Sequence, residues 1–63
     1  MRTSGVYLFH VWRLIPVYSG LVFTKYTVLI DGEEKGEIAI RDIKEAIKLA
    51  KLMVEEMLEK GQR

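Results

Sequence analysis

The C-terminal third of the chain carries the pattern that most restricts its fold, because apolar residues recur there at spacings of three and four. Asp42 is an expected helix N-cap, and Glu45, three residues later, would close a capping box. Gly61 is typical of a helix C-terminus, so the sequence predicts one helix from about residue 43 to residue 60. Its apolar stripe comprises Ile43, Ala46, Ile47, Ala50, Met53, Val54 and Met57, widened by Leu49 and Leu58.

The segments before this helix are rich in β-branched and aromatic residues, which favour strands. They predict strands over residues 6–15, 21–31 and 35–41. Pro16 and Gly20 bound a connection, because proline presets one turn angle and glycine permits a positive one. Residues 32–34 are expected to form a second, tighter loop. We therefore expect one α+β domain over residues 1–63, with a three-stranded antiparallel sheet packed on one C-terminal helix (β-β-β-α).

The chain is short for independent folding, since a domain of about 60 residues buries only roughly 60% of the surface that its unfolded form exposes. Such domains lean on disulfides, a metal or oligomerisation. The sequence has no cysteine, which fits a reducing, cytoplasmic compartment, and its single histidine, His10, has no carboxylate close in sequence to share a metal. Hydrophobic residues nevertheless make up 49% of the chain. We therefore expect a homodimer without metal or cofactor.

The pairing of the strands decides which side chains face the helix, because alternate residues point to opposite sides of a sheet. A three-residue loop over 32–34 pairs Val28 with Ile38 and Tyr26 with Ile40. A five-residue loop over 16–20 pairs Leu14 with Val22, and it avoids burying the charge of Arg13. The predicted helix-facing set is Leu8, His10, Trp12, Leu14, Tyr26, Val28, Ile30, Ile38 and Ile40.

The opposite side of the predicted sheet, the open face, combines apolar and basic residues. Its expected members are Tyr7, Phe9, Val11, Arg13, Ile15, Leu21, Phe23, Lys25, Thr27, Leu29, Glu37, Ala39 and Arg41. This pairing sets Lys25 opposite Arg41, and like charges directly across a sheet are destabilising. An incoming anion, or a carboxylate from Glu37 or from a partner chain, would compensate them.

The run from Tyr26 to Ile38 (YTVLIDGEEKGEI), followed by Asp42-Ile-Lys-Glu-Ala, resembles the arm-type, AP2-like N-terminal DNA-binding domains of tyrosine recombinases. The similarity covers about residues 22–54. It implies three strands, a hairpin containing Asp-Gly, and a DNA-binding sheet with Arg13, Lys25 and Arg41 as contacts. The hairpin of that family is usually rich in Lys and Arg, whereas this one carries Glu33, Glu34 and Glu37.

Two functional hypotheses follow. The first is a small, soluble, non-enzymatic protein-binding module that self-associates through apolar sheet or helix surface, because both the helix stripe and the open face are wider than one core requires. Its candidate dimer interface is Leu49, Leu52, Met53, Phe23 and Leu29. The alternative is a DNA-binding domain that uses the open face. Its candidate contacts are Arg13, Lys25, Arg41, Phe9 and Phe23.

Other classes of function have weaker support in the sequence. We find no nucleophile–base pair, no paired carboxylates in an apolar setting and no glycine-rich phosphate loop, so we expect neither catalytic residues nor a small-molecule substrate. Residues 6–23 are apolar over a length close to a membrane span. Arg13 near the middle of that stretch would cost at least ~2.5 kcal/mol in a bilayer, which disfavours insertion.

Overall fold

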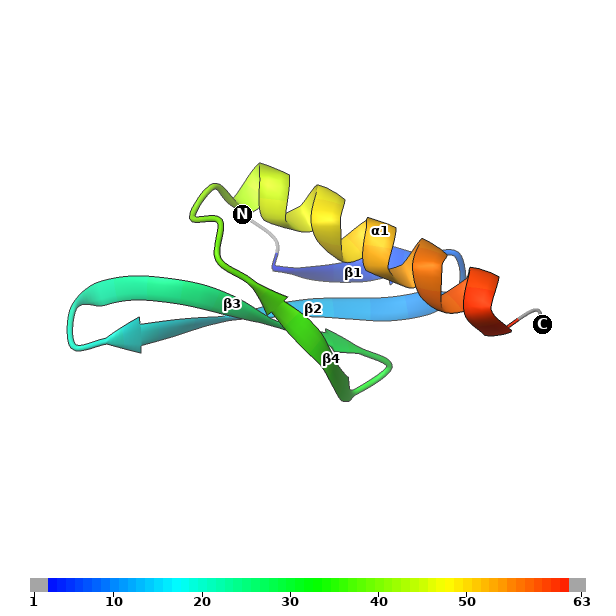
Figure 1. Cartoon of the computed structure of the whole chain (residues 1–63), viewed down its shortest axis with the longest axis horizontal. Helices are drawn as coiled ribbons and strands as arrows, with labels where there is room; N and C mark the ends of the chain where they lie inside the picture. Colours follow the sequence, from blue (N-terminus) through cyan, green and yellow to red (C-terminus); the bar gives the residue numbers. More distant parts are fainter. Residues whose placement is uncertain (1–2, 62–63) are drawn as a thin grey trace.

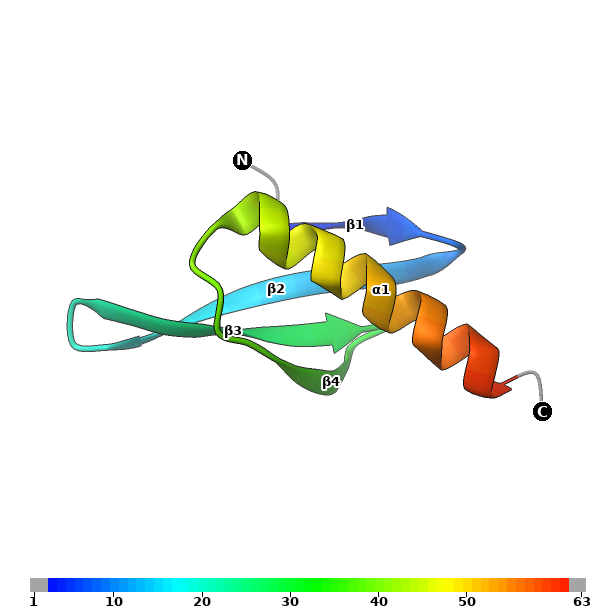
Figure 2. The ribbon, with the colours of Figure 1, turned by 45° about the horizontal axis from the view of Figure 1, so that its top comes forward.

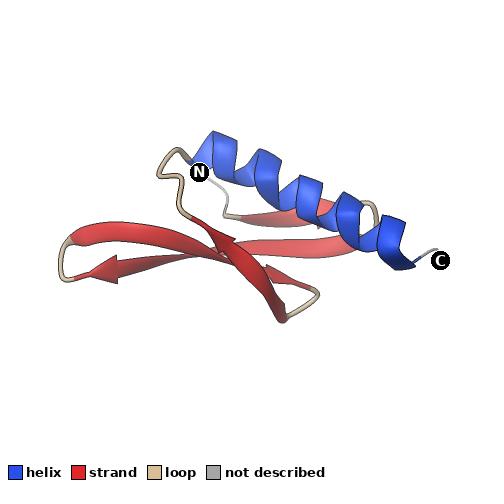
Figure 3. Ribbon diagram, in the orientation of Figure 1, coloured by secondary structure: helices blue, strands red, loops and turns tan. Residues whose placement is uncertain are grey.

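The computed structural model describes residues 3–61 and contains a four-stranded antiparallel sheet covered on one side by a single helix (Figures 1 and 3). The strands lie in the order of the sequence, β1-β2-β3-β4. The elements are β1 (Ser4–Tyr7), β2 (His10–Ser19), β3 (Val22–Ile30), β4 (Glu33–Ile38) and α1 (Ile43–Gly61). The α+β class and the C-terminal helix are therefore confirmed, whereas the number of strands is four rather than three.

The additional strand arises because the stretch predicted as one strand, residues 6–15, is folded back at Leu8 and Phe9. These two residues join β1 to β2 and both have positive φ angles, 50° and 69°. A two-residue turn with positive φ at both positions normally uses Asn or Gly. The turn was missed because Leu and Phe carry no turn signal.

The β2–β3 hairpin is longer than expected, and its turn consists of Gly20 and Leu21 alone. Leu14 pairs with Val28, so the predicted pairing with Val22 is wrong. Pro16 lies inside β2 rather than in a loop. This position tolerates proline because β1 pairs with β2 only as far as Arg13, which leaves that side of Pro16 without a neighbouring strand.

The β3–β4 hairpin turns at Asp31 and Gly32, with φ angles of 53° and 85°, instead of over residues 32–34. Tyr26 consequently pairs with Ile38, and a bulge at Lys35 restores the alternation. The set Tyr26, Val28, Ile30 and Ile38 still shares the helix-facing side, as predicted. Ile40 instead lies beyond the end of β4 and is exposed.

The helix begins as the sequence predicts. The backbone N–H of Lys44 donates to Asp42 Oδ1 at 3.0 Å, and the N–H of Ala46 donates to the carbonyl of Asp42 at 3.0 Å, so Asp42 is the N-cap. The side chain of Glu45 pairs with Lys48 Nζ at 3.6 Å, and no hydrogen bond that would close the predicted capping box is found within residues 3–61. The last helical residue is Gly61.

The core lies between the helix and the middle of the sheet, where α1 crosses the strands diagonally (Figure 2). Three small or β-branched helix residues are completely buried, and they let the helix backbone approach the sheet closely. The buried residues are Trp12, Leu14, Val28, Ile30, Ile38, Ala46, Ala50 and Val54.

Tyr7 also lies on the helix side of the sheet, not on the open face as predicted. Its hydroxyl donates to Glu55 Oε2 at 2.6 Å, and the Lys51 ammonium lies 5.5 Å from the centre of its ring. The hydrogen bond to Glu55 and partial burial raise the pKa of Tyr7. These contacts connect β1 to α1.

Candidate protein-interaction surfaces

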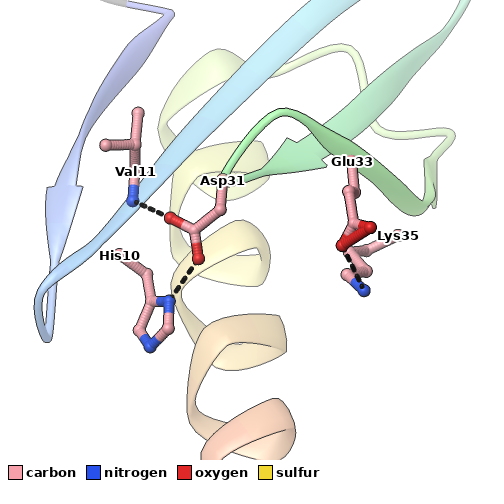
Figure 4. A network of polar contacts seen from close by, with 5 residues as sticks. All are labelled: His10, Val11, Asp31, Glu33 and Lys35. Carbon is pink, nitrogen blue, oxygen red and sulfur yellow. Dashed lines mark hydrogen bonds and ion pairs between the residues drawn. The ribbon is translucent and has the colours of Figure 1, made fainter.

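The best-defined polar cluster joins the two turns at one end of the sheet (Figure 4). His10 Nδ1 lies 2.5 Å from Asp31 Oδ2, and Asp31 Oδ1 accepts the backbone N–H of Val11 at 3.0 Å. The N–H of Asp31 in turn donates to the carbonyl of Val11 at 2.8 Å. The His10 hydrogen bond, followed by that from Val11, lowers the pKa of Asp31. The arrangement holds β2 to the β3–β4 turn and is structural in character.

Residues 17–25 of the β2–β3 hairpin, which we call the arm, project past the N-terminal end of α1 (Figures 1 and 2). A bulge between Val17 and Tyr18 changes the alternation in the arm and pairs Tyr18 with Phe23. The Phe23 ring lies 4.8 Å from that of Tyr26 and 6.0 Å from that of Tyr18, measured between ring centres. The aromatic side of the arm thus continues the helix-facing side of the sheet.

The arm is poorly covered in the isolated chain. Tyr18 is 58% exposed, Val22 is 66% exposed and Leu21, at the tip, is fully exposed. The Thr24 hydroxyl donates to the carbonyl of Val17 at 2.9 Å and stabilises the bulge. Apolar side chains are therefore held in an ordered strand pair without a layer over them.

A groove of about 340 Å³ runs between one flank of α1 and the segment that leaves β4. Its exposed large apolar residues are Leu52 and Ile40, at 49% and 40%. Glycine at position 36 gives the Met53 side chain room to reach the sheet, because a Cβ there would lie 2.7 Å from Met53 Cε. The groove is lined by Glu37, Ile38, Ala39, Ile40, Leu49, Leu52, Met53 and Glu56.

The arm and the groove adjoin one another on the helix side. Tyr26, which contacts the arm through Phe23, pairs with Ile38 in the wall of the groove. The Tyr26 hydroxyl also lies 3.5 Å from the carbonyl oxygen of Arg41, at the start of the helix. The arm and the groove are therefore neighbouring apolar surfaces, the first beyond the N-terminal end of α1 and the second beside its middle.

The open face lies on the other side of the sheet and is also partly apolar. Val6 and Val11 face each other across β1 and β2, and both are exposed. Lys25 forms an ion pair with Glu37 instead of lying opposite Arg41. The charge conflict predicted on this face is therefore absent for Lys25, and Glu37 is the carboxylate that compensates it.

The candidate DNA contacts are distributed over several parts of the molecule. Arg13 and Lys25 lie on the open face, whereas Arg41 lies in the connection between β4 and α1. Phe9 is fully exposed in the β1–β2 turn, and Phe23 lies on the helix side. The five residues do not share one surface.

The candidate dimer contacts are grouped more closely. Leu49, Leu52 and Met53 all line the groove, and Phe23 belongs to the adjoining arm. Leu29 is half-buried on the open face, opposite Arg13. The exposed apolar residues Tyr18, Leu21 and Ile40 were not among the candidate dimer contacts predicted from the sequence. The pair Gly20-Leu21 was the available signal for a two-residue hairpin turn.

Metal sites and membrane-spanning helices are two further kinds of functional feature. Within residues 3–61, no group of three or more His, Asp or Glu side chains is placed to hold a metal ion. Within these residues, no helix is both long enough and apolar enough to cross a membrane. Comparisons with protein-family models, with curated proteins and with solved structures found no match to this chain.

Proposed function

We propose that this chain is a small, non-enzymatic protein-binding module that self-associates as a homodimer through its helix-side apolar surface. The observation that supports the proposal most strongly is the exposure of Tyr18 and Leu21. Both belong to the arm, which extends past the N-terminal end of the helix (Figure 2). An isolated two-stranded hairpin is marginally stable in water. A partner that covers the arm would supply the missing layer.

A second copy of the chain is the simplest such partner. Small domains without disulfides or metals commonly gain stability by oligomerisation, and a two-fold dimer uses the same surface twice. A stable interface buries about 800 Å² per partner. That is about a sixth of the 4793 Å² that the isolated chain exposes. The arm and the groove together provide an apolar surface on which such an interface can form.

The DNA-binding alternative has weaker support from the geometry. Its basic residues Arg13, Lys25 and Arg41 are divided between two parts of the surface, and Lys25 is already paired with Glu37. Binding to DNA depends on several cations that contact phosphates together. DNA binding is therefore the weaker of the two proposals, and measurement of the solution mass with and without DNA distinguishes them.

The test is the solution mass of the purified chain, measured by light scattering over a range of micromolar concentrations. We expect twice the 7.3 kDa chain mass at both low and high salt, with no change when a short random-sequence duplex is added. A monomer under all conditions would contradict the proposal. A duplex complex that forms at low salt and dissociates at high salt would instead support DNA binding.

Two variants locate the interface. The double substitution Tyr18→Ser and Leu21→Ser removes apolar surface from the arm and should convert the dimer to monomer. Val6→Ser is the matched control, because Val6 is 71% exposed on the open face and should leave the dimer intact. If Val6→Ser dissociated the dimer and the arm variant did not, the interface would be the open face.

A further inference from the structure

We infer that the groove beside α1 is the docking site for the arm of a second copy, and that the exchange is reciprocal. This inference rests on the proposed self-association and specifies its geometry. It assigns Leu21 at the tip of the arm as the inserted residue. Leu52 and Ile40 are assigned to the walls that receive it.

The size of the groove and the apolar character of both surfaces suit this docking. The groove, at about 340 Å³, lies at the lower end of the range for concave binding sites, about 300–1,000 Å³. It is lined mainly by aliphatic side chains and by Met53, whose flexible thioether adapts to different shapes. The tip of the arm presents Leu21, whose side chain is fully exposed. An apolar tip therefore meets an apolar recess.

The charges of the two surfaces are also compatible. The arm contains one charged residue, Lys25, and the chain has no acidic residue between positions 14 and 30. The charged residues that line the groove, Glu37 and Glu56, are both acidic, and Glu37 is already paired with Lys25 of its own chain. The arm can therefore approach the groove without like-charge repulsion, which is costly at an interface.

The position of both surfaces permits a closed pair. The arm and the groove lie on the same side of the molecule and adjoin at Tyr26 and Ile38. A two-fold rotation that places one arm over the partner's groove places the partner's arm over the first groove, so the contact closes at two copies.

Direct pairing of the β4 strands is a weaker route to a dimer. The edge formed by β4 is short, carries Glu33, Glu34, Lys35 and Glu37, and is interrupted by a bulge at Lys35. Charges and bulges are features that protect edge strands from pairing with another chain. Docking of the arm in the groove uses side-chain contacts and does not require pairing along the charged, bulged edge of β4.

The absence of cysteine from the sequence allows a direct test by cross-linking. Two single variants, Leu21→Cys and Leu52→Cys, are mixed and mildly oxidised, and the product is followed by non-reducing electrophoresis. Docking raises the effective concentration of the two thiols from micromolar towards millimolar, so we expect the mixed disulfide to form at least about tenfold faster than the control pair. The control mixture is Val6→Cys with Leu52→Cys, since Val6 lies on the open face.

The possible outcomes separate this inference from the proposal on which it rests. If light scattering shows a dimer but the Leu21–Leu52 disulfide forms no faster than the control, the reciprocal arm exchange is wrong while self-association stands. Faster coupling of Leu21→Cys with itself would place the two tips together and would also overturn the exchange. A chain that stays monomeric would contradict both self-association and the arm exchange.

Discussion

The strands β2 and β3 form both the best-covered and the least-covered parts of the molecule. Under the helix, Trp12, Leu14, Val28 and Ile30 are buried, whereas in the arm Leu21 is fully exposed. Both regions have the β-branched and aromatic composition that favours strands. Strand composition therefore does not determine which of these residues are buried. Residues of β2 and β3 are buried where α1 covers them and exposed where it does not.

The largest expected difference between the two regions comes from removing one leucine from each. Leu14→Ala should lower the free energy of unfolding by about 2–5 kcal/mol, because it leaves a cavity in a closed core. Leu21→Ala should change it by no more than about 0.5 kcal/mol, as for an exposed site. Chemical denaturation at concentrations where the chain is monomeric measures both. Equal losses would mean that the arm is packed against the body in solution.

Substitutions at two glycines distinguish a loss of stability caused by crowding in the core from one caused by backbone strain in the arm. In Gly5→Ala the new Cβ would lie 2.9 Å from the buried Trp12 ring, so we expect a loss of about 1–3 kcal/mol. Gly20→Ala meets no atom within 4 Å but has a φ angle of 65°, and the strain alone should cost about 1–2 kcal/mol. Tryptophan fluorescence should shift in the Gly5 variant and stay unchanged in the Gly20 variant. A shift in both would contradict the separation.

A smaller effect is expected from the aromatic cluster of the arm. Phe23→Ala removes ring contacts with Tyr18 and Tyr26, and such pairs contribute about 0.5–1.5 kcal/mol beyond the area they bury. The loss should appear as faster amide hydrogen exchange in the arm. Protection of the amides around Leu14 and Val28 should persist, because local opening leaves the core intact. Uniformly faster exchange would show that the arm and the body unfold together.

The smallest effect concerns the charge at the opposite end of the sheet. Because the folded-state pKa of Asp31 is lowered, its carboxylate stabilises the fold above its unfolded pKa, and this contribution is lost as the pH falls through the folded pKa. Asp31→Asn removes the charge, and asparagine tolerates the positive φ angle at this position. The difference in unfolding free energy between the unchanged chain and the Asp31→Asn variant should therefore be largest near neutral pH and become smaller in acid. A constant difference would exclude the proton linkage.

The helix and most helix-facing residues could be predicted because their signals are local, whereas Leu8 and Ile40 were wrongly placed on that face. The N-cap at Asp42 and the stripe containing Ala46, Ala50 and Val54 depend on spacing within one element. Val28, Ile30 and Ile38 share one face as predicted, although the predicted loop over residues 32–34 was wrong. They do so because a bulge at Lys35 restores the alternation.

The strand number and the arm could not be predicted in the same way. The turn at Leu8 and Phe9 has positive φ angles on residues that rarely adopt them, so no composition signal marks it. Pro16 reads as a turn residue, but it is accommodated because β1 ends before reaching it. The groove residues Leu49, Leu52 and Met53 were suggested by an over-wide helix stripe. The arm depends on where the helix starts relative to the strands, which no single segment encodes.

The order of the strands has a consequence for how fast the chain folds. Each strand pairs with its sequence neighbour through a turn of two residues, so the sheet forms by closing short loops. Topologies dominated by local contacts fold in about milliseconds or less. Fastening β1 to α1 instead joins Tyr7 to Glu55, 48 positions apart, and must close almost the whole chain. We therefore expect rapid formation of the sheet, with docking of the helix as the slowest step.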